Sequence, residues 1–346
     1  MAFYSYTLKD FEKWDKIVKN FEKYDVYYLS GYVNAFKIHG DGEPLLLYYE
    51  GNGLKAINVV MLRDIANDHY FKGKIPNNCY FDLITPYGYG GWLIEGEGET
   101  RDLFAQYEQW CVNNNVVSEF VRFHPIIKNS KKVSDFYQVI DLGSTIYMDL
   151  STPEIIWQNL SSKNRNVIRK AINSEVKIHS GQYTEIYDTF MSIYNATMDD
   201  DNASPYYYFS RDFYDSILND LTQNSRVFWA ELNNEIIAVS IMIFANGYMN
   251  YHLSGSKREY RSYAPSNLLL YEAAVWGYEN GYKTFHLGGG VGSNEDNLYK
   301  FKSAFNKYGI ETFSIGKKVF LKDVYEKLCS MKPSIVNKNY FPSYRA

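Results

Sequence analysis

The sequence predicts an α+β fold in which two domains repeat one plan of helices and strands. Segments with apolar residues at helical spacing alternate with short apolar segments that are typical of strands. The 346 residues suffice for two domains of ordinary size. Two helix-to-strand segments, FAQYEQWCVNNNVVSEFVRFH and LLLYEAAVWGYENGYKTFHLG, share helix length, a tight Asn/Gly turn and a short strand. Their likeness favours a duplicated module.

The first half is predicted to open with a helix and to close with a helix-to-strand pair. Residues 8–23 place apolar side chains at helical spacing. Three strands are expected next, at 33–39, 44–50 and 54–61. The segment DLITPYGYGG at 82–91 has the proline and the glycines of a loop. Helix 100–114 then leads into strand 117–124.

The second half is predicted to repeat this plan. Its expected helices are 153–174, 184–198 and 265–280, and its expected strands are 226–232, 235–245, 248–254 and 282–287. A glycine-rich turn and a helix that carries Lys300 and Lys302 follow the last strand. Turn residues flank YMDL near 143–153, so we expect the domains to be 1–147 and 148–346.

Composition limits the classes of protein to which the chain can belong. The net charge is 36 − 40 = −4, so a global basic field for DNA is absent. The three cysteines form no zinc motif and suit a reducing compartment. The first residues have no apolar signal core, and no run approaches the roughly 20 apolar residues that span a bilayer. We therefore expect a cytoplasmic protein without a transmembrane segment.

The stretch LGGGVGSNED, which follows the last predicted strand, has two interpretations. Gly289 and Gly290 would let a ligand approach the backbone, or they would only turn the chain into the next helix. Ser293 and Asp296 have the spacing of a capping box. Glu295 and Asp296 would weaken the binding of an anion at that helix N-terminus. We therefore favour the turn with a cap over a phosphate cradle.

Four segments together resemble the FemABX-like branch of the GNAT acyltransferases. They are TPYGYGG at 85–91, LSSKNRNVIRKAINSEVKIHSG at 160–181, IYNATMDDDNASPYYYF at 193–209, and the LGGG and YKFKSAF elements within 264–305. The resemblance covers the chain from about residue 80 to residue 305. It implies two tandem GNAT-like domains, each with a mixed, mostly antiparallel sheet that helices cover on both faces. It also implies that the first domain is degenerate and binds the acceptor, whereas the second holds the donor and the catalytic groups.

The resemblance implies the transfer of an acyl or aminoacyl group to an amine, by direct attack and without a covalent enzyme intermediate. The acceptor would be a small, nucleotide-linked or bacterial cell-wall precursor. The co-substrate would be acyl-CoA or aminoacyl-tRNA, with charged tRNA as a possible partner, no tightly bound cofactor and no metal. The alternatives are a transferase specific for aminoacyl-tRNA and peptidoglycan precursors, and a non-catalytic module that binds a nucleotide-sugar or precursor.

The sequence departs from the family pattern where coenzyme A is ordinarily held. Residues 254–267, SGSKREYRSYAPSN, contain Arg258 and Arg261 but lack the glycine pair whose backbone grips the pyrophosphate. These two arginines and the two glycines at 289 and 290 are the expected donor-binding residues. The departure favours aminoacyl-tRNA as the donor. The acidic net charge and the absence of an inserted helical hairpin argue the other way.

The basic helix and one lysine are the leading candidates for contacts with phosphate or with the reacting group. Lys163, Arg165 and Arg169 belong to a cluster that suits phosphate, although a solvated helix face would look the same. Arg165 and Arg169 are four residues apart and share a face. Family analogy with the F-K element places Lys302 against the reacting carbonyl or a donor phosphate. The alternative for Lys302 is a surface lysine.

His252 is the candidate general base, because an imidazole titrates near working pH. Strand alternation is expected to place His252 and Ser254 on one face and Tyr251 and Leu253 on the other. His286 on the adjoining strand is a second candidate. A histidine in a strand is also a common core residue, and the spacing of the two is no metal signature.

The loop of the first half supplies the expected acceptor contacts. Family analogy places Asp82, Tyr87 and Tyr89 in the acceptor groove, although turn chemistry alone would also account for this segment. Asp199, Asp200 and Asp201 suggest either a cation site or, as we favour, a solvated loop after a helix.

Overall fold

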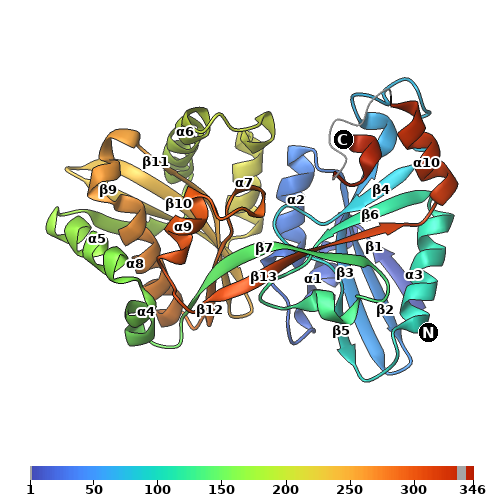
Figure 1. The fold of residues 1–346 in the computed structure, drawn as a ribbon, viewed down its shortest axis with the longest axis horizontal. Coiled ribbons are helices and arrows are strands. Elements are labelled where there is room, and N and C mark those ends of the chain that lie inside the picture. The colour runs from blue at the N-terminus through green and yellow to red at the C-terminus, as the bar shows by residue number, and fades with distance from the viewer. Residues whose placement is uncertain (1, 333–339) are drawn as a thin grey trace. The chain divides into compact units, whose positions relative to one another are not determined.

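The computed structural model describes residues 2–332 and 340–346 and divides the chain into two compact units. The first unit contains Met1–Leu142 and Phe313–Ala346, and the second contains Gly143–Thr312. The division differs from the expected one in two respects. The second unit begins slightly before residue 148, and the last part of the chain belongs to the first unit (Figure 1).

The sheet of the first unit has the strand order β1, β2, β3, β4, β6, β13, with β5 paired to β3. Strands β4 and β6 run parallel, whereas β1–β2, β2–β3, β3–β4 and β6–β13 are antiparallel. The bounds are Ala2–Tyr6 for β1, Glu43–Gly51 for β2, Leu54–Asp64 for β3, Phe81–Ile84 for β4, Leu93–Gly96 for β5, Val116–Arg122 for β6 and Ile310–Val319 for β13. The sequence analysis located β2, β3 and β6 but did not anticipate β1, β4, β5 or β13. The loop predicted at 82–91 is wrong at its start, because residues 82–84 belong to β4.

The helices of the first unit are α1 (Phe11–Lys19), α2 (Ser30–His39), α3 (Arg101–Asn113) and α10 (Lys322–Met331). The predicted strand at 33–39 is wrong, because these residues form α2. This helix is buried on most sides, so its sequence lacks the polar stripe that marks a surface helix. It ends at Gly40, whose φ of 101° is the left-handed cap conformation that glycine adopts without strain.

The sheet of the second unit has the order β7, β12, β11, β10, β9, β8. Strands β11 and β12 run parallel, whereas the pairs β7–β12, β10–β11, β9–β10 and β8–β9 are antiparallel. The bounds are Gln138–Asp149 for β7, Lys177–Gly181 for β8, Ser225–Leu232 for β9, Glu235–Ala245 for β10, Tyr248–Ser256 for β11 and Thr284–Gly288 for β12. Four of these strands match the predicted segments; β7 and β8 were not anticipated.

Six α-helices of the second unit fall within the described residues. They are α4 (Pro153–Asn159), α5 (Ser162–Asn173), α6 (Thr184–Asp200), α7 (Arg211–Asp220), α8 (Pro265–Glu279) and α9 (Asn297–Ser303). The single helix predicted at 153–174 is wrong, because the chain breaks at Leu160 and Ser161. Ser161 caps the new helix, its hydroxyl accepting from the backbone N–H of Asn164 at 3.1 Å.

The two units repeat one plan, which confirms the predicted fold class of tandem GNAT-like domains. In each unit a run of antiparallel strands leads through a long helix, α3 or α8, into a strand parallel to an earlier one. The closing strands are exchanged: β7 follows β6 in sequence but pairs with β12, whereas β13 follows α9 but pairs with β6. This exchange explains why the last part of the chain belongs to the first unit.

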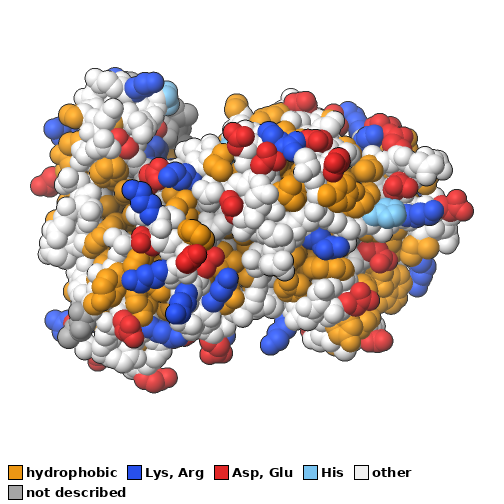
Figure 2. Space-filling view, turned by 180° about the vertical axis from the view of Figure 1, so that it is seen from behind, with side chains coloured by type: hydrophobic (Ala, Val, Ile, Leu, Met, Phe, Trp, Pro, Cys, Tyr) orange, Lys and Arg blue, Asp and Glu red, His pale blue; other side chains and the backbone are white. Residues whose placement is uncertain are grey.

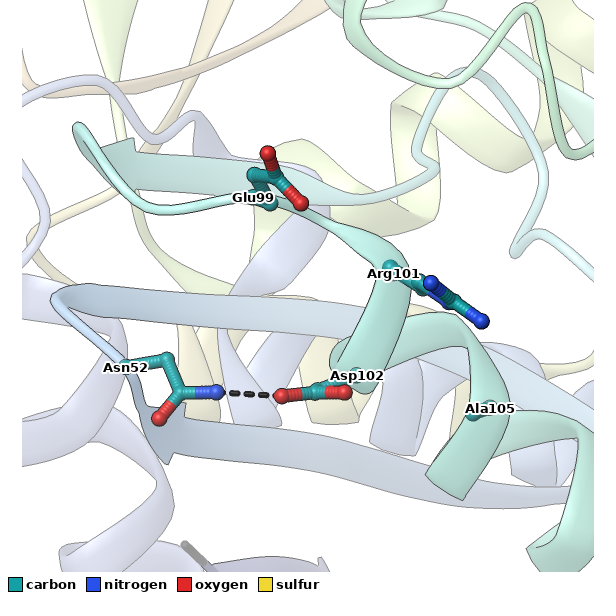
Figure 3. A pocket seen from close by; sticks show the side chains of 5 residues that line it. All are labelled: Asn52, Glu99, Arg101, Asp102 and Ala105. Atoms are coloured by element: carbon teal, nitrogen blue, oxygen red, sulfur yellow. Dashed lines mark hydrogen bonds between the residues drawn. The ribbon is translucent and has the colours of Figure 1, made fainter.

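The described surface carries charges of both signs. On the face that Figure 2 shows, lysine and arginine side chains lie among aspartate and glutamate side chains, as the net charge of −4 suggests. A hollow of about 630 Å³ opens at the start of α3 (Figure 3), where the amide of Asn52 donates to Asp102. Residues Glu99, Arg101 and Ala105 complete its lining, and none of the predicted site residues is among them.

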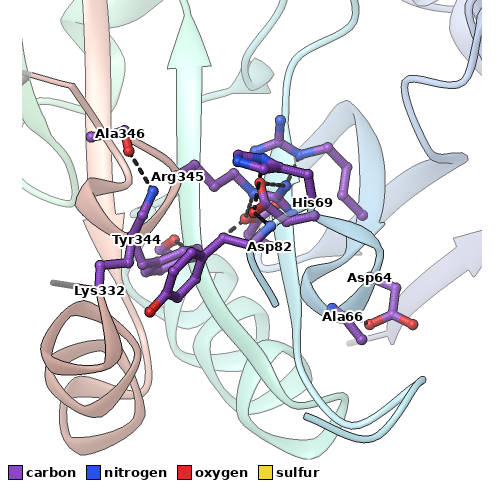
Figure 4. Close-up of polar contacts among 12 residues, drawn as sticks. Asp64, Ala66, His69, Asp82, Lys332, Tyr344, Arg345 and Ala346 are labelled. Atoms are coloured by element: carbon purple, nitrogen blue, oxygen red, sulfur yellow. Dashed lines mark hydrogen bonds and ion pairs between the residues drawn. The ribbon is translucent and has the colours of Figure 1, made fainter. Parts of the chain in front are cut away.

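The end of the chain is fixed to the first unit through one buried carboxylate (Figure 4). Asp82 on β4 is fully buried and receives Arg63 Nε at 2.7 Å and Arg345 Nε at 2.5 Å. The hydroxyl of Tyr344 also donates to it, at 3.1 Å. Burial by itself would raise the pKa of Asp82, but the two guanidinium groups outweigh it and hold the pKa below its ordinary value.

We predict that Arg345→Ala lowers the free energy of unfolding by about 2–3 kcal/mol, because Asp82 then keeps only Arg63 as a buried cationic partner. Urea denaturation at neutral pH measures the loss. The difference from wild type should shrink as the pH falls below about 4, since protonation of the carboxyl removes what Arg345 stabilises.

The control for Arg345→Ala is Lys322→Ala, which removes an exposed ion pair of 4.0 Å to Glu326. This change should cost less than about 0.5 kcal/mol. Equal costs for the two substitutions would show that the buried pair does not stabilise the first unit.

Candidate functional site

The site in the second unit begins where two parallel strands separate. Strands β11 and β12 pair over Tyr248–Asn250 against Thr284–His286. Beyond these pairs β11 continues to Ser256 and β12 to Gly288, so the strands diverge at their carboxyl ends. In open α/β sheets such a divergence at the carboxyl ends of strands is where ligands bind.

A β-bulge on each strand accounts for the divergence. In β11, Tyr251 opposes Met242 and Leu253 opposes Ile241, so His252 is an extra residue against β10. In β12, Leu287 is likewise an extra residue against β7. A bulge bends its strand and increases the local twist. Because both bulges lie just after the last parallel pair, the strands bend at the point where they part.

Lys302 reaches into this opening from α9. The helix begins at Asp296, whose carboxylate accepts from the backbone N–H groups of Tyr299 at 2.8 Å and Val291 at 3.0 Å. The predicted cap at Ser293 is therefore wrong by one turn. Lys302 Nζ donates to the carbonyl oxygen of Gly289 at 2.7 Å.

The ammonium group of Lys302 lies in a desolvated position. Its side chain is 8% exposed, and its Nζ is 5.9 Å from the centroid of the Tyr251 ring on β11. Burial lowers the pKa of Lys302 from 10.5 to about 8, against the opposing effect of Asp296. At neutral pH the group is still mostly protonated, so it can donate hydrogen bonds to an oxyanion or a phosphate.

His252 has a different character from the one expected. Burial lowers its pKa to about 3, so it is neutral at working pH and a weak proton acceptor. The expected alternation of side chains is wrong here, because the bulge at His252 interrupts it. The hydroxyls of Tyr251 and Ser254, expected on opposite faces, are hydrogen-bonded to each other. His286 is also buried, opposite Asn250 in the sheet.

The basic helix α5 is only partly available for phosphate. Arg165 donates to the carbonyl oxygens of Leu160 at 2.6 Å and Gln158 at 3.3 Å, which satisfies the end of α4. Arg169 is exposed, bonds to the side chain of Asn166 and lies 5.2 Å from the ring of Trp157. Lys163 is exposed.

The expected donor-binding residues fall in two loops. Arg258 and Arg261 are exposed in the 3-10 turn Arg258–Tyr263 that precedes α8, and Arg261 lies 3.8 Å from Asp200. Gly289 supplies the carbonyl that Lys302 binds. A Cβ atom on Gly290 would lie 2.4 Å from the carboxylate of Asp296, so this glycine makes room for the cap, as the turn interpretation expects.

The corresponding place in the first unit is closed. Strands β4 and β6 also run parallel, but Arg122 at the end of β6 donates to the carbonyl oxygens of Thr85 and Pro86 at 3.0 Å and Gly88 at 3.2 Å. The backbone N–H of Gly90 donates to the carbonyl of Arg122 at 2.8 Å. The loop after β4 therefore fills the position where the second unit is open.

Of the predicted acceptor residues, Tyr87 and Tyr89 lie in one aromatic cluster, whereas Asp82 lies outside it. The Asp82 carboxylate binds Arg63 and Arg345 (Figure 4). Tyr87 stacks on Phe36 with ring centroids 5.4 Å apart. Tyr89 contacts the rings of Tyr27 at 5.7 Å, His124 at 5.8 Å and Phe313 at 5.6 Å. Both tyrosines are half-buried in an aromatic cluster of the first unit.

The sequence analysis missed three residues that shape these places. Tyr251 and Asn164 lie next to predicted site residues, but no sequence pattern distinguishes them from core residues. The sequence held one indication of Arg122, a charged residue near the end of a predicted apolar strand.

Among residues 2–332 and 340–346, no group of three or more His, Cys, Asp or Glu side chains is placed to hold a metal ion. No helix in these ranges is both long and apolar enough to cross a bilayer.

The chain is similar to known acyltransferases in sequence and in fold. The family model described as the acetyltransferase (GNAT) domain matches residues 159–302. The structure of FemX superposes with a TM-score of 0.69 at 12% identity, covering 94% of this chain and 99% of FemX. The C-terminal domain of a putative lysylphosphatidylglycerol synthetase from Agrobacterium fabrum gives a TM-score of 0.57 at 14% identity, covering 89% of this chain and 91% of that domain.

L-PGS from Bacillus licheniformis gives a TM-score of 0.56 at 14% identity, covering 89% of this chain and 91% of that chain. A search of the curated proteins found no match. The matched segment of the family model contains α5, α8, both diverging strands and Lys302. Residues 159–302 therefore match the model of the acetyltransferase (GNAT) domain, and the chain shares the fold of FemX.

Proposed function

We propose that the chain is an N-acyltransferase that moves an acyl or aminoacyl group onto the amine of a small or envelope-precursor substrate. One observation carries the proposal. A desolvated lysine, Lys302, lies where two parallel strands of a GNAT domain part, next to Tyr251. The family match and the fold support acyl transfer in general, and this site is our reason for proposing that the second unit performs it.

The reaction requires no covalent bond to the protein. The neutral amine of the acceptor attacks the donor carbonyl carbon, and the amine proton passes to the departing thiolate or ribose oxygen as the carbon–nitrogen bond forms. Negative charge develops on the carbonyl oxygen and then expels the thiolate or ribose hydroxylate of the donor. The Lys302 ammonium has N–H bonds beyond the one that Gly289 accepts, and we assign them to this oxygen. His252 stays neutral and is a weaker candidate for taking the proton.

Aminoacyl-tRNA is our first candidate for the donor, and acyl-CoA is the second. The turn before α8 has exposed Arg258 and Arg261 but no glycine pair to bring its backbone against a pyrophosphate. Exposed Lys163 and Arg169 on α5 add positive charge that suits a phosphate backbone. For the first unit we propose acceptor binding, with Tyr87 and Tyr89 in that role, and no transfer of its own, because Arg122 fills its opening.

Lys302→Ala should lower kcat about 10²–10³-fold, the usual cost of removing one donor to a developing oxyanion. Because the change also removes a largely buried alkyl chain, the melting temperature is measured alongside to show that the variant is folded. Steady-state kinetics with the donor–acceptor pair measures the effect. The matched control is Lys300→Ala on the same short helix, an exposed residue whose loss should leave kcat unchanged. Equal turnover by the wild type and Lys302→Ala would rule out this role.

The rate should fall as the pH rises through about 8, because the pKa of Lys302 lies there and the proposed active form is the ammonium. Lys302→Arg stays protonated over this range, so its profile should lose the alkaline decline even if its overall rate is lower. The pH dependence of kcat/KM for both proteins tests this. An identical alkaline side in both profiles would contradict the assignment.

Binding of the donor should stabilise the protein by roughly 2.7 kcal/mol at 100 times its dissociation constant. We expect charged tRNA and a UDP-linked precursor to raise the melting temperature more than acetyl-CoA does. A shift with acetyl-CoA alone would refute the tRNA assignment. Binding of donor and acceptor without an acylated product by mass spectrometry would favour the alternative, a non-catalytic module.

A further inference from the structure

Asn164 on α5 is a buried polar side chain that contacts the end of α9. It is 2% exposed and contacts two other helices. Its amide nitrogen donates to the carbonyl oxygen of Ala304 at 3.3 Å, and its amide oxygen accepts from the side chain of Asn267 at 2.8 Å. Asn164 therefore joins the end of α9 to the first turn of α8.

The contact with Ala304 matters because α9 is short. It has 7 residues, and Lys302 lies in its last turn, where the carbonyl groups have no partner within the helix. The Ala304 carbonyl is satisfied from outside, by the backbone N–H of Ser161 at 2.9 Å and by Asn164. A helix this short is not held in place by helix propensity alone. Its position therefore depends on the groups that bind its two ends.

The other end of α9 is held by its own cap, Asp296, which also binds the loop after β12 through the Val291 N–H at 3.0 Å. This contact fixes the start of the helix with respect to Gly289, the acceptor of the Lys302 bond. The end of the helix has Asn164 as its side-chain partner. Loss of that partner would leave the Ser161 N–H on the Ala304 carbonyl but would loosen the turn that carries Lys302, while the start of the helix stays fixed.

The contact with Asn267 links the Asn164 side chain to the region where we expect the donor to bind. Asn267 is the third residue of α8, directly after the turn that holds Arg258 and Arg261. We infer that Asn164 is a positioning residue, which sets Lys302 at a fixed place with respect to the first turn of α8 by binding Ala304 and Asn267 together. The inference rests on the proposed function for its catalytic consequence but not for its structural one.

Asn164→Ala and Asn164→Asp test the contact with Ala304. Both remove the donor, but the aspartate keeps an oxygen for Asn267. If Lys302 loses its place, its ammonium moves toward water and its pKa rises from about 8 toward the ordinary value. NMR titration of labelled lysine, with the Lys302 signal assigned by its loss in Lys302→Arg, measures that pKa without any substrate. We expect the pKa to rise in both variants.

Activity supplies the second readout. A misplacement of about 1 Å costs on the order of 10²-fold in rate, so kcat should fall by that order while KM for the acceptor changes little. Asn267→Ala breaks the other contact and leaves Ala304 bound, so it should give a smaller loss with the Lys302 pKa near that of wild type. Asn173→Ala, at the exposed last position of α5, is the matched control and should change neither readout.

The outcomes separate the two proposals. An unchanged Lys302 pKa in folded Asn164→Ala and Asn164→Asp would overturn the positioning role. A raised pKa together with no acyl transfer by the wild type would support the positioning role and refute the proposed function. If Asn164→Ala does not fold, Asn164→Asp and Asn267→Ala still decide the question, since each keeps one of the two contacts.

Discussion

The separation of β11 from β12 is the constraint on which the rest of the site depends. Beyond the last parallel pair, the Lys302 side chain is largely removed from water. The lowering of the Lys302 pKa from 10.5 to about 8 corresponds to about 3 kcal/mol of differential destabilisation of its ammonium form. The carbonyl of Gly289 recovers part of that cost with a single hydrogen bond. A group in this state interacts more strongly with a developing negative charge than a hydrated lysine would.

The two units share one arrangement of strands and helices but differ at the carboxyl ends of their parallel strands. A loop covers these ends in the first unit. In each unit one long helix connects two parallel strands, and the ends of those strands define the same place in the fold. In the second unit, bulges at His252 and Leu287 separate the strands, and a lysine enters from a short helix. In the first unit, the loop after β4 returns across the same place, and Arg122 binds three of its carbonyl groups. A cation lies at each place: Arg122 binds the loop carbonyls, whereas Lys302 donates to the carbonyl of Gly289.

Much of the fold could be predicted from the sequence, because long amphipathic helices and apolar strands have strong periodicity. α3, α6 and α8 and the strands β9–β11 were located by that signal alone. The failures have physical causes. Helix α2 is buried on most sides and shows no polar stripe, and the break at Leu160 depends on a side-chain cap rather than on glycine or proline. Strands β7 and β13 are exchanged between the units, and no local pattern records which partner a strand has.

The site was less predictable than the fold, because its properties come from contacts between distant segments. The F-K element indicated Lys302 through family resemblance, but its burial, its partner Gly289 and its neighbour Tyr251 depend on three elements meeting. A bulge moves one residue out of alternation and leaves no mark in the sequence, which is why His252 was expected to act as a base on a regular strand. Desolvation lowers the pKa of the His252 imidazole as it lowers that of Lys302, because each charged form loses surrounding water. In our proposal the cation that meets the developing charge is therefore Lys302 rather than a histidinium.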